Sequence, residues 1–379
     1  MAQHSEILII GGGVIGLSIA HSLRKAGVRD IAILDRGTLG CEASAAAAGM
    51  LAPQAEADSA DTFFEFCRDS LALYEQFAHE LLDETGIDIE LDRTGTLYLG
   101  FNTADAEELS NRFRWQREAG LDVEQLSIED VIRLEPNVSG HVNSGLLFPN
   151  DWQVENRRLL SALSRFAKIH DVGVYENTRV DELIVENGRA AGVISGSRRF
   201  LAKTTIVTTG AWTSLVKFGD DGWPFDVRPM RGQMICFRPE RPMFSHVVYS
   251  PRGYVVPRAD GRVLVGATVE DVGFEKDVTE AGVESLRTAA FEIAPTLESK
   301  QLVEKWSGLR PFVADGLPVI GALERYEDLL VATGHYRNGI LLAPITAELI
   351  KSKLITGAES AYFDAFGAKR FNRSTNAVR

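Results

Sequence analysis

The hydrophobic positions near the start of the chain fall into two short, unbroken runs separated by a helical pattern. Residues 7–10 are four consecutive apolar residues, typical of a strand that is buried on both faces. Residues 17–26 favour a helix, which Gly27 closes. Residues 31–34 form a second apolar run that ends at Asp35. The order strand, helix, strand predicts one βαβ unit.

Similar runs return far along the chain. Residues 205–210 and 329–334 are again apolar strands that lead into a glycine, and we expect both to join the sheet of the first strand. Residues 95–101 alternate like a half-buried strand, and alternating segments between 225 and 268 predict a second, antiparallel sheet. The predicted fold class is therefore α/β, with the second sheet inserted between separated pieces of the first.

Helical spacing and short strand patterns account for most of the remaining chain. A single helix is expected from Phe63 to Gly86, because apolar residues recur there at intervals of three and four. Further helices are predicted at 104–119, 127–134, 154–169, 279–293 and 339–355, and a meander of short strands at 172–180, 183–185, 191–194 and 200–202.

The glycines after the first run have the spacing G-x-G-x-x-G. Gly11 permits a tight turn, Gly13 lets the backbone approach a pyrophosphate, and Gly16 lets the helix pack closely on the strand. Asp35 follows Gly16 by 19 residues, where its carboxylate can accept both hydroxyls of an adenosine ribose and disfavours the 2′-phosphate of NADP. A glycine triplet alone often marks only a turn, but strand, helix, second strand and acid are in register here. The pattern therefore favours a nucleotide site.

Residues 37–49 have almost only small side chains. One interpretation is an alanine helix that packs tightly against its neighbours. The other is a loop over the phosphates and ring of a cofactor, which the position of the segment just after Asp35 favours.

The composition narrows the possible partners. The chain has 379 residues, of which 45% are hydrophobic and 25% charged, and its formal net charge is -13. These values exclude disordered and collagen-like proteins, and the negative charge argues against a nucleic-acid partner. A small-molecule partner is expected instead.

The three cysteines, Cys41, Cys67 and Cys236, have no C-x-x-C spacing, so neither a disulfide framework nor a metal site is expected. This cysteine usage fits a reducing, cytoplasmic environment. Residues 7–20 are interpreted as strand and helix rather than as a signal peptide, because no basic residue precedes them. No apolar run reaches the roughly 18 residues that a membrane helix needs, so no membrane span is expected.

Two late segments concentrate residues suited to chemistry. Residues 306–321 place Arg310 before a proline and ahead of a turn, and residues 334–344 place backbone amides at a predicted helix start. Together with the N-terminal unit, these segments resemble the FAD-dependent D-amino acid oxidase superfamily, and most closely its glycine oxidase branch. The motifs that carry the resemblance are residues 44–51, 254–258, 266–268, 308–311 and 334–344.

This resemblance implies FAD and amine oxidation, whereas the residue patterns alone indicate only a nucleotide-binding enzyme. It implies a Rossmann-like FAD-binding domain formed by residues 1–87, 145–222 and 306–365, and a substrate domain formed by residues 88–144 and 223–305. The implied cofactor contacts are Gly11, Gly13, Val14, Ile15, Gly16, Asp35, Arg36, Ser44, Ala47, Gly49, Met50, Val180, Gly210, Trp212, Gly334, Arg337, Asn338, Gly339, Ile340 and Leu341.

The resemblance also assigns the substrate contacts. Arg310 matches the anchor of the substrate carboxylate, and Tyr254 matches a tyrosine that hydrogen-bonds the same group; we expect these two to be the catalytic residues. Further substrate contacts are expected at Met50, Tyr249, Arg252 and Arg337.

The sequence departs from the family pattern at two positions. Arg252 stands where the pattern has histidine, and Val269 stands where it has methionine, and both could alter the mouth of the pocket. Residues 311–318 contain no cysteine of the kind that attaches FAD in sarcosine oxidases, so noncovalent FAD is expected. His335 is interpreted as a structural histidine rather than a catalytic base.

The function that the resemblance implies is oxidation of glycine, sarcosine and small D-amino acids to an oxo acid, ammonia or an amine, and hydrogen peroxide. Oxygen is the expected acceptor, thiamine thiazole biosynthesis the expected pathway, and a homo-oligomer such as a tetramer the expected assembly. Two alternatives stay open: an amine dehydrogenase that uses another electron acceptor, and a noncatalytic flavoprotein.

Overall fold

The first apolar run forms the centre of a large sheet. In the computed structural model, which describes residues 3–219 and 222–372, β1 (Gln3–Ile10) pairs in parallel with β2 (Ile31–Leu34) on one side and with β11 (Arg198–Val207) on the other. The side chains of β1 alternate between two hydrophobic cores, one on each face of the sheet. The strand is therefore buried on both faces, as its unbroken apolar run predicts.

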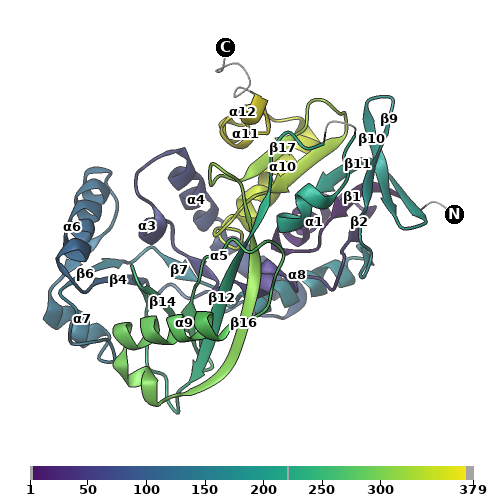
Figure 1. The fold of residues 1–379 in the computed structure, drawn as a ribbon. Coiled ribbons are helices and arrows are strands. Elements are labelled where there is room, and N and C mark those ends of the chain that lie inside the picture. Colours follow the sequence, from purple (N-terminus) through teal and green to yellow (C-terminus); the bar gives the residue numbers. More distant parts are fainter. Residues whose placement is uncertain (1–2, 220–221, 373–379) are drawn as a thin grey trace.

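The order of this first sheet is β17-β18-β11-β1-β2-β8, and β9 and β10 join it through β11 (Figure 1). β18 pairs in parallel with β11, so both late strands that lead into a glycine return to the first sheet, and the carboxyl ends of β1, β2, β11 and β18 lie along one edge. The remaining strands are β8 (Gly173–Tyr175), β9 (Glu182–Glu186), β10 (Arg189–Ser195), β17 (Val319–Ala322) and β18 (Leu329–Thr333).

The second sheet has the order β16-β12-β15-β14-β13-β4-β6-β5. Its described strands pair antiparallel except for β13 and β4, which are parallel. The strands are β4 (Thr96–Gly100), β5 (Glu124–Leu126), β6 (Ser144–Phe148), β12 (Arg228–Arg238), β13 (Val247–Ser250), β14 (Gly253–Pro257), β15 (Val263–Gly266) and β16 (Gln301–Phe312). A third, two-stranded sheet consists of β3 (Met50–Leu51) and β7 (Trp152–Gln153).

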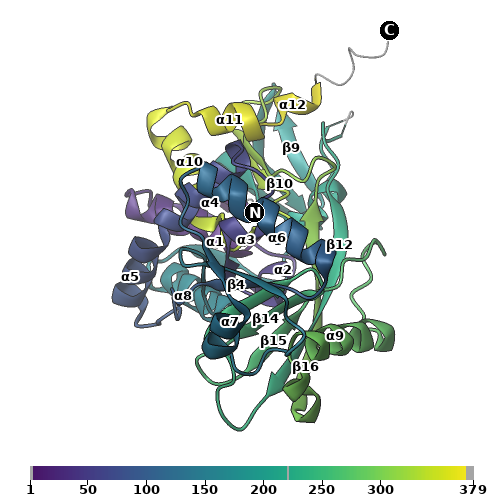
Figure 2. The same ribbon diagram turned by 90° about the vertical axis from the view of Figure 1, so that its left-hand side faces the viewer.

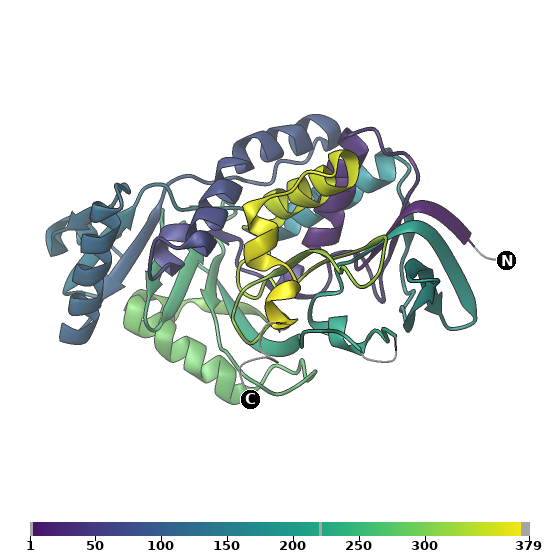
Figure 3. The ribbon, with the colours of Figure 1, turned by 90° about the horizontal axis from the view of Figure 1, so that it is seen from above.

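Helices cover the sheets on their outer faces. α1, α8 and α10 pack together on one face of the first sheet, and α9 packs on β12 and β14 of the second sheet (Figures 1 and 2). α6 and α7 lie at the end of the molecule opposite the N-terminus (Figure 3). The α-helices are α1 (Val14–Lys25), α2 (Ala43–Ala46), α3 (Pro53–Glu56), α4 (Thr62–Ala72), α5 (Tyr74–Thr85), α6 (Thr103–Glu118), α7 (Ile128–Leu134), α8 (Asn156–Ile169), α9 (Glu280–Ile293), α10 (Ala343–Thr356), α11 (Ala361–Phe366) and α12 (Lys369–Asn372). No helix within the described ranges combines the length and the hydrophobicity needed to cross a membrane.

Some predicted elements were wrong in their limits. The helix expected from Phe63 to Gly86 is two helices, α4 and α5, which meet at Leu73 and pack on different partners, α10 and α8. The strands expected at 200–202 and 205–210 form one strand, β11, which ends at Val207 and pairs with β1 on both sides of the exposed Lys203. β8 covers only the start of the strand expected at 172–180, and β4 is fully buried rather than half-buried.

The last predicted helix begins later than its apolar pattern suggested. α10 starts at Ala343 instead of 339, and residues 339–342 form turns. Pro344 explains the difference, because proline has no N–H to donate within a helix and is tolerated only in the first turn.

The domain limits remain a proposal. By sheet membership, β6 (Ser144–Phe148) and the whole of β16 (Gln301–Phe312) belong to the second sheet. The proposed boundaries at 144/145 and 305/306 cut through these two strands. If each strand is assigned to the domain of its sheet, the boundaries move to the ends of β6 and β16.

Candidate active site

A large cavity of about 1170 Å³ lies where the first sheet meets the second. One end is lined by the loop after β1 and by the end of β2, and the other by strands of the second sheet and by the turn after β18. The cavity therefore opens at the carboxyl ends of the parallel strands, where open α/β sheets bind their ligands.

Of the three motif glycines after β1, Gly11 and Gly13 line the cavity, and their contacts with a pyrophosphate stay predictions. Gly11 has a φ of +106°, and a Cβ there would lie 2.5 Å from the carbonyl oxygen of Thr208, so only glycine fits this turn. Gly13 precedes α1 and supplies no side-chain cap, and the first turn carries no acidic residue. The Ser44 hydroxyl accepts from the first N–H of the helix, that of Val14, and the helix N-terminus faces the cavity, where it favours an anion. Gly16 does not line the cavity; a Cβ there would lie 2.0 Å from the Gly11 oxygen, so its role is close packing.

Asp35 lines the same end of the cavity, directly after β2. Its two carboxylate oxygens accept hydrogen bonds from the N–H groups of Gly12 (2.7 Å) and Gly37 (2.8 Å). Burial raises the pKa of Asp35, and these two hydrogen bonds act in the opposite direction. Each oxygen keeps further capacity to accept a hydrogen bond, as recognition of a ribose requires.

The cavity wall beside Asp35 is aromatic and cationic. The Arg36 guanidinium lies 4.6 Å from the centre of the Trp212 ring, and that ring lies 6.1 Å from the ring of Phe274. Val180 and Gly210 also line this part of the cavity, as expected.

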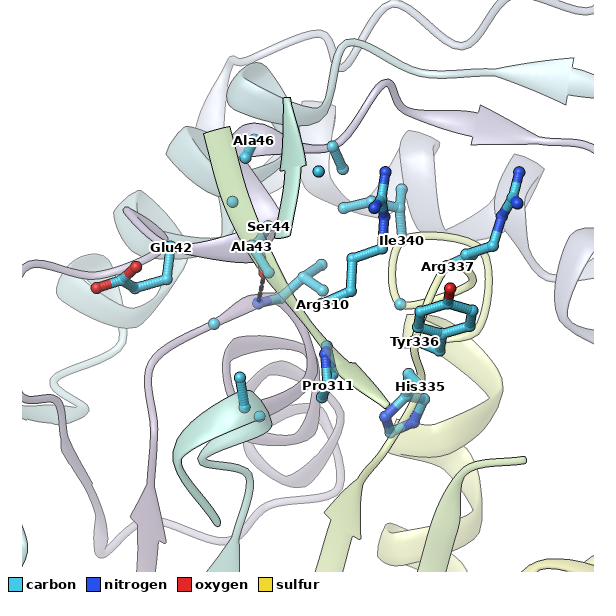
Figure 4. Close-up of a pocket in the computed structure, with 18 of the residues that line it drawn as sticks. Glu42, Ala43, Ser44, Ala46, Arg310, Pro311, His335, Tyr336, Arg337 and Ile340 are labelled. Carbon is cyan, nitrogen blue, oxygen red and sulfur yellow. Dashed lines mark hydrogen bonds between the residues drawn. The ribbon is translucent and has the colours of Figure 1, made fainter. Parts of the chain in front are cut away.

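The small-residue segment 37–49 is a loop that contains only the four-residue helix α2, and it borders the cavity. The Ser44 hydroxyl accepts a hydrogen bond of 3.0 Å from the N–H of Val14, which joins this loop to the start of α1 (Figure 4). The Asn156 side-chain amide donates to the carbonyl oxygens of Ser44 and Ala45. The interpretation as a cofactor loop therefore agrees with the structure better than a packed alanine helix.

Two buried residues that hold this loop were not found from the sequence. Arg258 donates to the carbonyl oxygens of Ala48 and Val154 and to the side chains of Gln153 and Asn156. Arg258 belongs to the motif at residues 254–258, which was the available signal, whereas no pattern marked Asn156.

Arg310 lies on β16 in the second sheet. Its Nη1 donates to the carbonyl oxygen of Thr268 (3.0 Å), and none of the ion pairs among the described residues includes it. Its guanidinium lies directly over Gly232 of β12, where a Cβ would be 2.3 Å from Nη1. Gly232 thus makes room for Arg310, a role that no sequence pattern indicated.

Tyr254 is buried on β14 at the same end of the cavity. Its hydroxyl donates to the Met234 sulfur, a weak acceptor, at 3.3 Å. Burial raises the pKa of Tyr254, and the charges of Arg310 and Arg337 oppose that rise. The phenol is therefore a neutral donor that can exchange its weak partner for a stronger one.

Arg337 extends in the same direction as Arg310, from the turn after β18 (Figure 4). Its Nη2 donates to Glu56 Oε1 (3.2 Å) and to the Tyr249 hydroxyl (3.1 Å). Glu56 raises the pKa of Arg337, and burial raises the pKa of Tyr249 to about 12. Met50 lines the cavity as expected, whereas Glu56 was not anticipated because it belongs to no motif.

Arg252 lines the cavity, but its charge is directed to acidic residues. Its guanidinium bonds Asp105, lies 3.5 Å from Glu292 and stacks over Phe101. A direct contact of Arg252 with substrate stays a prediction, and this pairing argues against it. Val269, the other departure from the family pattern, is exposed at the cavity.

His335 has the surroundings of a structural histidine, although its partner is a side-chain hydroxyl. It is buried, its Nε2 lies 3.1 Å from the Thr346 hydroxyl, and burial lowers its pKa to about 3. Its neighbour Gly334 has a φ of +74° and does not line the cavity, and Leu341 packs in the core instead.

The turn between these residues does face the cavity, through Arg337, Asn338, Gly339 and Ile340. The N–H groups of Gly339 and Ile340 donate to no backbone acceptor within the described ranges. They can therefore bind an electron-rich edge of a ligand. Within the same ranges, His, Cys, Asp and Glu side chains form no group of three that could hold a metal ion.

A profile of the family described as "FAD dependent oxidoreductase" matches residues 6–352. The chain belongs to this family. The glycine oxidase of Bacillus licheniformis is 34% identical over 371 residues, with 98% of each chain covered. The crystal structure of glycine oxidase from Geobacillus kaustophilus has a TM-score of 0.92 at 32% identity and covers 97% of this chain and 99% of its own.

A third relative, the "Bifunctional protein ThiO/ThiG" of Synechocystis, is 33% identical over 99% of this chain, which spans 55% of that longer protein. The expected family, fold class and FAD cofactor are confirmed. The structure fits FAD, because the N-terminus of α1, the Asp35 carboxylate and the backbone amides of the turn after β18 all face one cavity. The contacts of individual residues with FAD or substrate stay predictions.

Proposed function

We propose that this protein oxidises glycine, sarcosine and small D-amino acids to the oxo acid and ammonia or an amine, with FAD as its cofactor and oxygen as its acceptor. The observation that carries the proposal is the Arg310 guanidinium, which faces the cavity beside the neutral hydroxyl of Tyr254 and has no carboxylate partner in the described part of the chain. The names of the relatives at 31–34% identity support it.

The chain's own residues act by binding and orientation. Arg310 can grip the substrate carboxylate with two parallel hydrogen bonds, while Tyr254 turns its hydroxyl from the Met234 sulfur to the same carboxylate. This grip fixes the α-carbon and holds it for reaction. FAD, when bound, supplies the redox chemistry by accepting a hydride from that carbon.

Among the described residues that line the cavity, the histidine is His335, and it is no candidate base because it is neutral, buried and engaged with Thr346. The substrate amine therefore reacts after losing its proton to solvent. The cavity residues contribute orientation and charge rather than proton abstraction.

Noncovalent binding of FAD, a homo-oligomer such as a tetramer and a cytoplasmic location belong to the proposal. None of the three cysteines lines the cavity, which supports noncovalent binding. The ThiO part of the names of the fused relatives supports a role in thiamine thiazole biosynthesis.

The test is peroxide formation by the FAD-loaded protein with glycine, sarcosine, D-alanine and D-proline. Turnover of at least one of them is expected, and turnover of none would refute the proposal. Comparing oxygen with dye acceptors distinguishes an oxidase from a dehydrogenase. Acid precipitation should release the yellow colour into the supernatant if FAD is noncovalent.

A further inference from the structure

Three arginines line the end of the cavity that holds Tyr254, and acidic residues neutralise two of them. Arg252 pairs with Asp105 and Glu292, and Arg337 pairs with Glu56. Arg310 alone takes part in no ion pair in the described part of the chain. Among the described residues at this end of the cavity, Arg310 is therefore the arginine that has no acidic partner.

Glu56 is held in place by buried groups outside the cavity. It is the last residue of α3, and the carboxylate of the fully buried Asp151 accepts from the N–H groups of Gln54 (3.0 Å) and Ala55 (2.8 Å) at the start of this helix. At the other end, the buried Arg112 donates to the carbonyl oxygens of Gln54 and Ala57. These bonds fix the backbone of α3, from which the Glu56 side chain reaches Arg337.

We propose that Glu56 is a specificity-determining residue: by neutralising Arg337, it restricts the enzyme to amines with one carboxylate and excludes those with a second. This inference rests on the proposed amine oxidase function and names the substrate class that the same cavity selects. Arg310 holds the single carboxylate.

The exclusion has two physical causes. A second carboxylate near Arg337 would lie close to the like charge of Glu56, and it could pair with Arg337 only by displacing a partner 3.2 Å away. Burying that second carboxylate without a partner costs its full desolvation. With Glu56 uncharged, Arg337 keeps only the neutral Tyr249 hydroxyl and can bind a carboxylate through two parallel hydrogen bonds.

The experiment compares Glu56→Gln with the wild type on two matched substrate pairs. Iminodiacetate differs from sarcosine by a carboxylate on the N-methyl group, and D-aspartate differs from D-alanine by a carboxylate on the side chain. The expected result is a rise of at least tenfold in the ratio of kcat/KM for the diacid to that for the monoacid. A ratio within twofold of the wild type would overturn the proposal.

Two further variants show whether charge is the cause. In Glu56→Gln/Arg337→Met the gain should vanish, because the cation that receives the second carboxylate is gone. Glu292→Gln is the matched control, because it removes an acid from Arg252, which still keeps Asp105; its ratio should stay at the wild-type value. A gain that persists without Arg337, or an equal gain in Glu292→Gln, would overturn the proposal.

Both substrates of a pair are assayed with the same enzyme preparation. A partial loss of active enzyme therefore lowers both kcat/KM values equally and leaves their ratio unchanged. If Glu56→Gln does not retain FAD, Asp151→Asn replaces it as the test variant, because it weakens the hydrogen bonds that fix the backbone of α3 from outside the cavity. It should raise the ratio of diacid to monoacid kcat/KM as well. An unchanged ratio would refute the proposal. A wild type that oxidises none of the monoacids refutes the proposed function itself. In that case, malonate binding relative to acetate, followed by the flavin spectrum, still tests the role of Glu56.

Discussion

Gly232 is the position where the structure makes its sharpest prediction about Arg310. A Cβ at this position would lie 2.3 Å from Nη1, 2.4 Å from Cζ and 2.4 Å from Nη2 of Arg310. Ordinary contacts begin near 3.4 Å, so in Gly232→Ala the guanidinium must move by about 1 Å. The clashing atoms are the far end of a flexible side chain, so the guanidinium moves and the β12–β16 pairing stays.

The displaced guanidinium can no longer reach the substrate carboxylate with both hydrogen bonds. Loss of one hydrogen bond to a charged group costs about 1.5–3 kcal/mol, which corresponds to a fall in kcat/KM of about 10- to 150-fold. The assay is steady-state peroxide formation with sarcosine, together with FAD content and melting temperature. We expect those two properties to stay at the wild-type values.

Gly140→Ala is the matched control, because a Cβ there meets no atom within 4 Å. It should leave kcat/KM unchanged. If Gly232→Ala has wild-type kcat/KM, Arg310 does not hold the substrate in the position that the structure shows, and the reasoning is refuted.

Three further predictions concern substrate binding, the cofactor loop and pH. Arg310→Ala should retain FAD but lose bleaching of the flavin by substrate under anaerobic conditions; unchanged bleaching would mean that Arg310 is not the anchor. Asn156→Ala removes the hydrogen bonds to the carbonyl oxygens of Ser44 and Ala45, so it should weaken FAD binding about tenfold. The affinity is measured by the fluorescence of released FAD, and an unchanged affinity would contradict this role of Asn156. Burial raises the pKa of Asp151 to about 7. The folded state therefore binds a proton at Asp151 more tightly than the unfolded state does. As a result, the free energy of unfolding falls as pH rises from about 4 to 7. In urea titrations from pH 5 to 8, Asp151→Asn should therefore lose less stability than the wild type, and parallel curves would contradict the assignment.

Several features could be predicted because the atoms that create them are close in sequence. The turn at Gly11, the helix from Val14 and the acid at Asp35 follow from backbone geometry and the order of adjacent elements, and together they predicted a nucleotide site. The start of α10 was also within reach, since Pro344 alone excludes a regular helix through residue 340.

Other features depend on residues that only folding brings together. Glu56 and Arg337 are 281 positions apart, and Asp151 caps a helix that begins almost a hundred positions earlier. Gly232 lies in a strand whose own pattern is ordinary, and its importance comes from Arg310 on the neighbouring strand. Such contacts leave no periodic signal, because each partner satisfies its local element equally well without the other.

The sequence by itself therefore determined the nucleotide-binding unit, the two-sheet class and, through its motifs, the family and the expected anchor at Arg310. Only the tertiary structure decided which arginine remains uncompensated. Strand and helix preferences arise from neighbouring residues, whereas the charge of a cavity is the sum of side chains from distant elements, and packing alone decides which acid meets which base.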